Sequence, residues 1–298
     1  MTAHDLLYPA TRGAIFVALL LITGTQTAIA LIGRALGDDP AVAVPLQDRL
    51  RRFLRPVLLA LLCFCLTKGA LQLLSFVDPG EDVTPELLRS VLLSGTWGIS
   101  WLVQLATVAL LAMICGKRPR IDAGLTAIVI VAQTGMGHAA GSTWPAPIGR
   151  IVDTLHLAGA GIWLGTLAAL AIVAFPLLRG EEQVASLARV VREFSTYARV
   201  GVALVVATGV IAGKTYVGSI FTIAQSTWGQ LLLFKLAGML GVMALGWYNW
   251  RIVTPALAGG HPTCRQRLRR AVRLELALGL IMLALTAFLV NTALPGEG

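Results

Sequence analysis

Eight long apolar runs constrain the fold of this chain more than any other feature of its sequence. A helix needs about 20 mostly apolar residues to span the hydrocarbon core of a membrane. The runs between polar or Pro/Gly breaks cover approximately residues 11–36, 54–77, 87–115, 121–138, 147–178, 195–217, 227–253 and 271–293. We therefore expect an all-α fold, a polytopic membrane helix bundle with eight transmembrane helices.

The composition also favours a membrane protein. Hydrophobic residues make up 56% of the 298 positions, charged residues make up only 13%, and the mean hydropathy is +0.78. Soluble globular domains are about one quarter charged. The loops between the apolar runs are too short to form a soluble domain.

Basic residues indicate the orientation of the bundle. Cytoplasmic loops of membrane proteins retain Lys and Arg, and most of the 24 basic residues flank the first, third, fifth and seventh loops. Both termini are therefore expected on the periplasmic side. The net charge of +9 follows from this topology. Because the basic residues are spread over short loops and not gathered in one arm, we expect no nucleic-acid partner.

The segment RIVDTLHLAGAGIWLG, residues 150–165, places Asp153 and His156 one helical turn apart within an apolar run. His156 would lie about 12 Å from the outer end of its span. Ionisable groups at this depth are costly and normally face one another or a wet cavity. We interpret His156 as a metal ligand and Asp153 as the acceptor that orients its ring through the other nitrogen. The alternative is an interhelical hydrogen bond that only stabilises the bundle.

Trp163 and two glycines follow on the same segment. The spacing of Asp153, His156 and Trp163 places them on one face of a helix, so Trp163 is a candidate pathway residue, with ordinary helix packing as the alternative. Gly161 and Gly165 predict a face that a neighbouring backbone can approach closely.

The segment GMGHAAG, residues 135–141, supplies a thioether and a second imidazole near the same outer end. Thioethers select Cu(I), and imidazole accepts either copper state, so Met136, His138 and His156 together favour copper. Met136 and His138 would point about 200° apart on an ideal helix. Joint ligation therefore requires the helix to unwind near Gly135 and Gly137, and Met136 has core packing as its alternative role.

Two lysines lie in the same outer half of the predicted bundle. Lys235 enters its span to a depth similar to that of His156, and Lys68 lies about 15 Å from the outer end of the second run. We place both on the pathway. Because a cation repels a metal ion, Lys235 is expected to pair with Asp153 or to be neutral.

The N-terminus suggests a further site. Removal of the initiator methionine would leave Thr-Ala-His, with His4 as the third residue. A free amine, two backbone amides and the imidazole of His4 would then form the square-planar nitrogen set that Cu(II) prefers.

The cysteines do not indicate a disulfide framework. Cys115 and Cys264 fall on the predicted cytoplasmic side, where thiols stay reduced. Cys63 and Cys65 are two residues apart on one expected helix, so they cannot close on one ion, and we expect them to pack in the core.

Three segments within residues 194–297 resemble the CopD copper-resistance family. They are FSTYARVGVALVVATGV, TWGQLLLFKLAGMLGVMALGWYNWRIVTPAL and RLRRAVRLELALGLIMLALTAFL. Upstream, GHAAG and LHLAGAGIWLG resemble the fourth and fifth spans of that family. On this basis we divide the chain into an N-terminal five-span region, 1–193, with the histidine site, and a CopD-like three-span domain, 194–298.

The resemblance implies a multi-pass protein of the bacterial inner membrane that handles copper, often beside a periplasmic copper-binding partner of the CopC type. It implies Lys235, Trp228 and Glu275 as family-pattern positions, and His138 and His156 as ligands. We therefore expect the chain to transport copper ions, Cu(I) or Cu(II), from the periplasm inward, and so to contribute to copper homeostasis and resistance. Membrane lipid would surround it.

Two other functions stay open on the sequence. Two histidines near one face would also suit a b-type haem in a membrane electron carrier, with Arg150, Lys214 or Lys235 near the propionates. The third possibility is a non-transporting copper sensor or assembly protein. No P-loop or DKTG-like phosphorylation motif is visible, so we expect neither an enzyme nor ATP-driven pumping within this chain.

Overall fold

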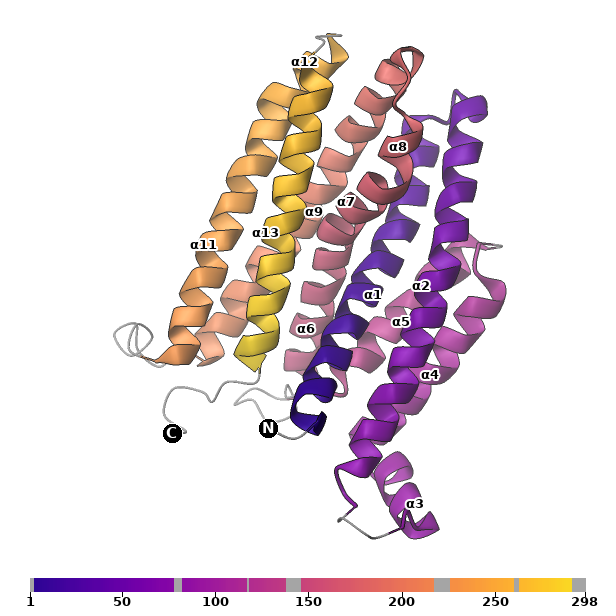
Figure 1. Ribbon diagram of the computed structural model, residues 1–298, viewed down its shortest axis with the longest axis vertical. Helices are drawn as coiled ribbons and strands as arrows, with labels where there is room; N and C mark the ends of the chain where they lie inside the picture. Colours follow the sequence, from indigo (N-terminus) through magenta and orange to yellow (C-terminus); the bar gives the residue numbers. More distant parts are fainter. Residues whose placement is uncertain are drawn as a thin grey trace.

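The computed structural model describes residues 3–77, 82–116, 118–137, 146–216, 226–259 and 263–290. Figure 1 shows that these residues form a bundle of long helices, and they contain no strand. The all-α expectation is therefore confirmed. The first half of the chain contains α1 (Ala3–Ala35), α2 (Pro40–Leu74), α3 (Pro85–Leu93), α4 (Thr96–Ile114) and α5 (Pro119–Thr134).

In the second half of the chain, short π-helical segments join α-helices into longer continuous helices, which we call rods. The first rod consists of α6 (Ala146–Ala160), the π segment η2 (Gly161–Gly165), α7 (Thr166–Ala169), the π segment η3 (Leu170–Ala174) and α8 (Phe175–Leu177). The remaining elements are the 3-10 turn η4 (Glu181–Gln183), α9 (Val184–Tyr216), α11 (Thr227–Tyr248), the π segment η5 (Asn249–Val253), α12 (Thr254–Ala258) and α13 (Cys264–Val290).

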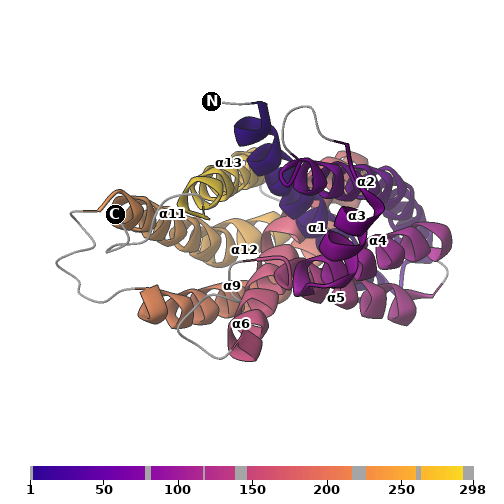
Figure 2. The same ribbon diagram turned by 90° about the horizontal axis from the view of Figure 1, so that it is seen from below.

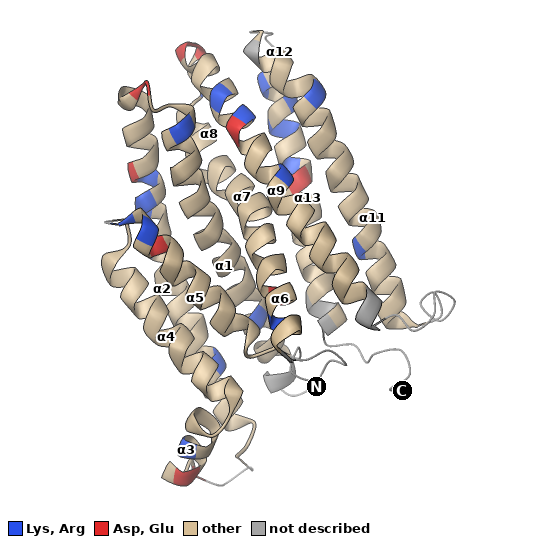
Figure 3. Ribbon diagram, turned by 180° about the vertical axis from the view of Figure 1, so that it is seen from behind, with Lys and Arg blue, Asp and Glu red and all other residues tan. Residues whose placement is uncertain are grey.

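Helix α1 lies at the centre of the bundle. Viewed from below in Figure 2, α2, α4 and α5 lie on one side of α1, and α9, α11 and α13 lie on the other. The start of α1 and the end of α13 are at the same end of the bundle (Figure 1). Figure 3 shows that Lys and Arg gather at the opposite end, near α8 and α12.

Two groups of buried side chains hold these layers together, and α1 contributes to both. Ile15, Leu58 and Val108, all fully buried, belong to a cluster that joins α1 to α2, α4 and α5. A larger cluster joins α1 to the second half of the chain, and it includes Leu31 and Leu170. The predicted boundary between residues 193 and 194 lies inside α9, within reach of this larger cluster, and the division into two regions stays a prediction.

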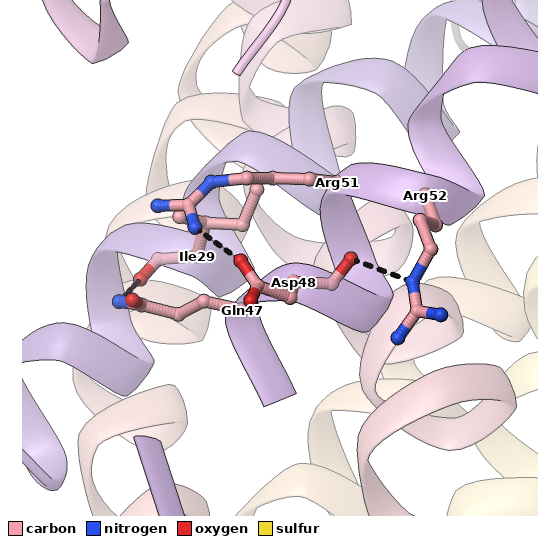
Figure 4. Close-up of polar contacts among 5 residues, drawn as sticks. All are labelled: Ile29, Gln47, Asp48, Arg51 and Arg52. Atoms are coloured by element: carbon pink, nitrogen blue, oxygen red, sulfur yellow. Dashed lines mark hydrogen bonds and ion pairs between the residues drawn. The ribbon is translucent and has the colours of Figure 1, made fainter. Parts of the chain in front are cut away.

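The hairpin between α1 and α2 is secured near the basic end. Gln47 Nε2 donates a hydrogen bond of 3.0 Å to the carbonyl oxygen of Ile29, which joins the two helices (Figure 4). In the same view, Arg51 pairs with Asp48 at 2.8 Å, and Arg52 Nε donates to the Asp48 carbonyl. Helix α2 begins at Pro40, well before the apolar run at residue 54, and Arg49, Arg51 and Arg52 lie within its first half.

The rod that begins with α6 approaches α1 almost to backbone contact. A Cβ atom at Gly165 would lie 1.9 Å from the carbonyl oxygen of Leu20, and one at Gly161 would lie 2.7 Å from the side chain of Thr23. Only glycine permits this approach. The prediction that Gly161 and Gly165 mark a close-packing face is confirmed.

Six helices among the described residues are long and apolar enough to cross a membrane. They are Leu6–Ala35, Pro40–Leu74, Thr96–Ile114, Pro147–Leu177, Glu181–Gly213 and Thr227–Leu257. Of the other two predicted spans, 121–138 corresponds to the 16-residue helix α5, which is short for a membrane crossing, and 271–293 corresponds to α13. The six agree with predicted spans in position, and the count of eight stays a prediction.

The predicted span 87–115 begins too early, because the structure divides this segment into α3 and α4. Helix α3 ends at Leu93, and α4 begins at Thr96 after Gly95, whose backbone is extended. A Cβ at Gly98 would lie 2.2 Å from the carbonyl oxygen of Val91, so the first turn of α4 packs directly against α3. Ser94 and Gly95 therefore end one helix and start another, whereas the hydropathy of the segment alone predicted a continuous helix.

Candidate functional site

His156 lies between α6 and α9 in the half of the bundle nearer the start of α1. It is ten residues into α6, which corresponds to a depth of about 15 Å. Its Nδ1 atom is 2.9 Å from Oγ1 of Thr208 on α9. The side chain is half-buried, in keeping with a position at a helix interface.

The hydrogen bonds of Thr208 favour one tautomer of the imidazole. Thr208 Oγ1 donates its single hydrogen to the carbonyl oxygen of Leu204, at 2.5 Å, four residues earlier on the same helix. Toward His156 the hydroxyl is therefore the acceptor, so Nδ1 carries the ring hydrogen. Nε2 then has a free lone pair, which is the form of histidine that binds a metal ion.

Small residues allow α9 to come close enough for this contact. A Cβ at Gly201 would lie 2.7 Å from the carbonyl oxygen of Gly159, and 2.8 Å from Cβ of Trp163. Trp163 is 4% exposed and packs against α9 from the π segment η2. This burial is typical of helix packing. A role of Trp163 on a pathway stays a prediction.

Lys235 on the neighbouring helix α11 is a charged residue that acts on this interface. It lies on α11, eight residues after Thr227, at a depth of about 12 Å. Its charge acts electrostatically on His156. No carboxylate among the described residues forms an ion pair with Lys235, so the expected pairing with Asp153 is not present there.

Asp153 does not orient the ring of His156. Its side chain is exposed on α6, and the charge that acts on it is that of Arg12 on α1. The hydrogen bond that sequence reasoning gave to Asp153 belongs to Thr208, because Thr208 faces His156 across the α6–α9 contact, whereas Asp153 is exposed on α6.

Lys68 and Met136 form a second buried polar group, on the other side of α1. Lys68 is 1% exposed, and its Nζ donates to Sδ of Met136 at 3.4 Å. The same ammonium lies 5.9 Å from the ring centroid of Trp97, which is within range of a cation–π interaction. Met136 is thus buried against α2 and α4, so the structure groups it with Lys68.

A chain of buried amides continues from this group. Cys65 Sγ donates to Gln104 Oε1 at 3.5 Å, and Gln104 Nε2 donates to Gln133 Oε1 at 3.0 Å. Trp101 Nε1 donates to the carbonyl oxygen of Cys65 at 2.8 Å. Cys65 is buried, as expected, whereas Cys63 is exposed on the outer surface of α2.

Two predicted ligands fall outside the described structure. Helix α5 ends at Thr134, so the chain does leave the helix near Gly135, as joint ligation by Met136 and His138 requires. His138 itself and the side chain of His4 lie outside the described residues. Thr134 and Thr154 meet at 3.1 Å between their hydroxyl oxygens, which brings the end of α5 against α6. A meeting of His138 and His156 stays a prediction.

The described residues contain no cluster of three or more His, Cys, Asp or Glu side chains suited to hold a metal ion. His156 therefore belongs to no such ligand cluster in the part of the chain that the structure covers.

Sequence reasoning missed several of the residues that complete these groups. Thr208, Gln104 and Gln133 are single polar residues within apolar runs, and that was the signal available for each. Trp228 and Glu275, the family-pattern positions, are both buried, at 5% and 3% exposure.

Two family models match most of the chain. The model of copper resistance protein D matches residues 188–289, and that of the copper resistance protein D-like, N-terminal domain matches residues 1–146. The chain belongs to the copper resistance protein D family. The resemblance seen in its last three apolar runs is therefore confirmed, and family membership favours neither the haem-carrier nor the sensor alternative.

Two relatives of this copper resistance protein D family member carry copper-related names. Copper transport protein CutJ of Bacillus subtilis (strain 168) is 26% identical over 229 residues, which are 73% of this chain and 41% of CutJ. Copper resistance protein D of Pseudomonas syringae pv. tomato is 28% identical over 212 residues, which are 64% of this chain and 67% of that protein. The chain thus matches less than half the length of CutJ. No solved structure matches it.

Proposed function

We propose that this chain transports copper ions across the bacterial inner membrane, from the periplasm inward, and that His156 binds the ion during passage. The support comes from family membership together with the candidate membrane spans. The observation that carries the residue assignment is the hydrogen bond between His156 and Thr208, which leaves Nε2 of a half-buried imidazole available to a metal.

The proposed direction rests on charge. The end of the bundle where Lys and Arg gather is the cytoplasmic end by the positive-inside rule. His156 and Lys235 lie in the other half, which then faces the periplasm. A periplasmic protein of the CopC type would deliver copper there, and His4, Met136 and His138 would serve as entry ligands. In this topology the chain crosses the membrane eight times, with both termini outside.

Lys235, if it is charged and not neutral as expected from the sequence, would keep the binding of copper weak. A permeation site must bind its ion well enough to admit it and weakly enough to release it. A positive charge close to a single imidazole lowers the affinity of that imidazole for a cation. Copper would therefore bind His156 briefly, which agrees with the lack of further clustered ligands in the described part of the chain.

Copper accumulation in cells tests this function. A bacterial strain that lacks its own copper importer would express the wild-type chain, His156→Ala or His261→Ala at equal abundance, and total cell copper would be measured after exposure to a low copper concentration. His261 lies in the sequence between the last two predicted spans, so it is a matched histidine control. We expect wild type and His261→Ala to raise cell copper, and His156→Ala to stay at the level of cells without the protein. Equal accumulation by His156→Ala and wild type would refute the assignment.

A further inference from the structure

Glu275 and Asn249 form a buried acid–amide pair between α13 and η5. Glu275 is 3% exposed, and Asn249 Nδ2 donates a hydrogen bond of 2.5 Å to its Oε1. The Oδ1 atom of Asn249 is also buried, yet it accepts no hydrogen bond from any residue that the structure describes. Asn249 lies 14 residues beyond Lys235 on the continuous helix of α11 and η5. This separation is about 21 Å along the helix axis toward the basic end.

No positive charge neutralises Glu275 within the described chain. The ion pairs there involve only Asp38, Asp39 and Asp48. Arg273 on α13, Arg251 in η5 and Arg34 on α1 are all exposed. Arg251 lies over the ring of Trp250, at 4.9 Å from its centroid, and Arg34 lies 5.8 Å from that of Tyr197.

The other elements packed against α13 bring few titratable groups. Helices α7 and α12 contain no charged residue, and α11 contributes Lys235, far along the rod, and Tyr248, half-buried beside Asn249. On α1, Arg12 lies at the opposite end of the helix from Arg34. The carboxyl group of Glu275 therefore faces an amide in apolar surroundings.

An ionised carboxylate in this position would be poorly stabilised. A buried charge without an opposite charge is costly, and a buried acceptor without a donor costs about 1–3 kcal/mol. One proton on Oε2 of Glu275 removes both penalties, because the carboxylic acid then offers an O–H donor that matches the unpaired Oδ1 of Asn249. A carboxylic acid and an amide each have one donor and one acceptor in this arrangement, so they are complementary.

We propose that Glu275 and Asn249 form a proton-binding site, in which the proton is held on Oε2 of Glu275 and shared with Oδ1 of Asn249. The proton comes from water and returns to it when the site ionises. The π segment supports this use, since π-helical turns within helices occur frequently at functional sites. Thr254 donates to the Asn249 carbonyl at 2.9 Å and so secures the backbone at the pair.

Ionisation would turn this neutral pair into a negative site in the half of the bundle beyond His156. Loss of the proton leaves a carboxylate that attracts a cation. A proton and a cation therefore compete for this site. The proton site itself does not depend on copper as cargo, and it therefore goes beyond the proposed function.

Infrared spectroscopy of the purified, copper-free full chain in lipid nanodiscs tests the proposal directly. We expect a carbonyl-stretch band of a protonated carboxylic acid at neutral pH, which shifts in heavy water and is lost in Glu275→Gln. The amide that Glu275→Gln introduces can donate to Oδ1 of Asn249 and accept from its Nδ2, so this variant should keep the thermal unfolding midpoint of wild type. Absence of the band in folded wild type would overturn the proposal.

A second variant guards against misassignment of that band. Asn249→Leu removes the partner, so the acid band of Glu275 should move to the higher frequency of a less strongly hydrogen-bonded carboxylic acid. A band unmoved by Asn249→Leu would contradict the pair. The last measurement is a titration with sodium chloride, with choline chloride as the control. Loss of the acid band with sodium but not with choline would identify a metal-cation site and overturn the proton assignment. These measurements contain no copper, so a failure of copper transport leaves their result intact.

Discussion

Nδ1 of His156 and Oγ1 of Thr208 lie 2.9 Å apart across the contact between α6 and α9, and the threonine is the acceptor. A hydroxyl that already donates to its own helix thus selects which imidazole nitrogen stays free. The hydrogen bond thereby fixes the orientation of a lone histidine within an apolar helix.

Thr208→Val should weaken copper binding while Thr208→Ser should preserve it. Valine keeps the volume but removes the acceptor, so the imidazole loses its orientation and its preferred tautomer. Loss of such outer partners costs about 10–100-fold in metal affinity. Competition with a chromophoric copper chelator in detergent would measure this, and equal affinities of the valine and serine variants would show that the hydroxyl does not matter.

Lys235→Gln should bind copper more tightly than wild type. The substitution removes a positive charge that acts on His156, and the same chelator competition should show a gain in copper affinity, because like charges repel. The rate at which copper is released should fall accordingly. Unchanged affinity would mean that Lys235 does not influence the ion, and Arg150→Gln, in the first turns of α6, serves as a matched loss of charge elsewhere.

Gly165→Ala should destabilise the bundle, because its Cβ would lie 1.9 Å from the carbonyl oxygen of Leu20 on α1. Overpacking of this kind typically costs about 1–3 kcal/mol. Gly246→Ala on α11 is the control, since a Cβ there meets nothing within 4 Å. The thermal unfolding midpoint in detergent should fall for the first variant only, and similar midpoints for both would contradict the close contact.

Single cysteines should report the topology. In a background without native cysteines, Asp82→Cys should react with a membrane-impermeant maleimide on intact spheroplasts, and Glu182→Cys should react only after the membrane is opened. Both positions are exposed, and the elements beside them, α3 and α8, lie at opposite ends of the bundle. The reverse pattern of labelling would place the basic end outside and would invert the proposed direction.

The long helices could be predicted because a helix that crosses a membrane needs a long run of apolar residues. The runs near Pro147–Leu177 and Thr227–Leu257 were recognisable from hydropathy, and the glycine spacing at Gly161 and Gly165 indicated the contact with α1. Hydropathy could not locate the break at Ser94 and Gly95, since a helix end depends on local backbone geometry and on packing of α4 against α3.

The site was harder to predict because it depends on which helices touch. Spacing along α6 suggested Asp153 as the partner of His156, but the partner came from α9, which no periodicity in one helix reveals. Met136 likewise matched a ligand by chemistry, yet its neighbour is Lys68, from a helix far away in sequence. The pair of Glu275 and Asn249 also joins two elements, and only their packing shows that one acceptor is left unpaired.

X-ray absorption at the copper edge would show whether His156 binds copper, because it reports the atoms bound to the ion. Purified wild type, His156→Ala and His261→Ala would be loaded with equal copper and freed of excess. We predict imidazole scattering in wild type and in His261→Ala, and its loss or marked reduction, with less bound copper, in His156→Ala. Copper content and imidazole scattering in His156→Ala that equal those of wild type would contradict it.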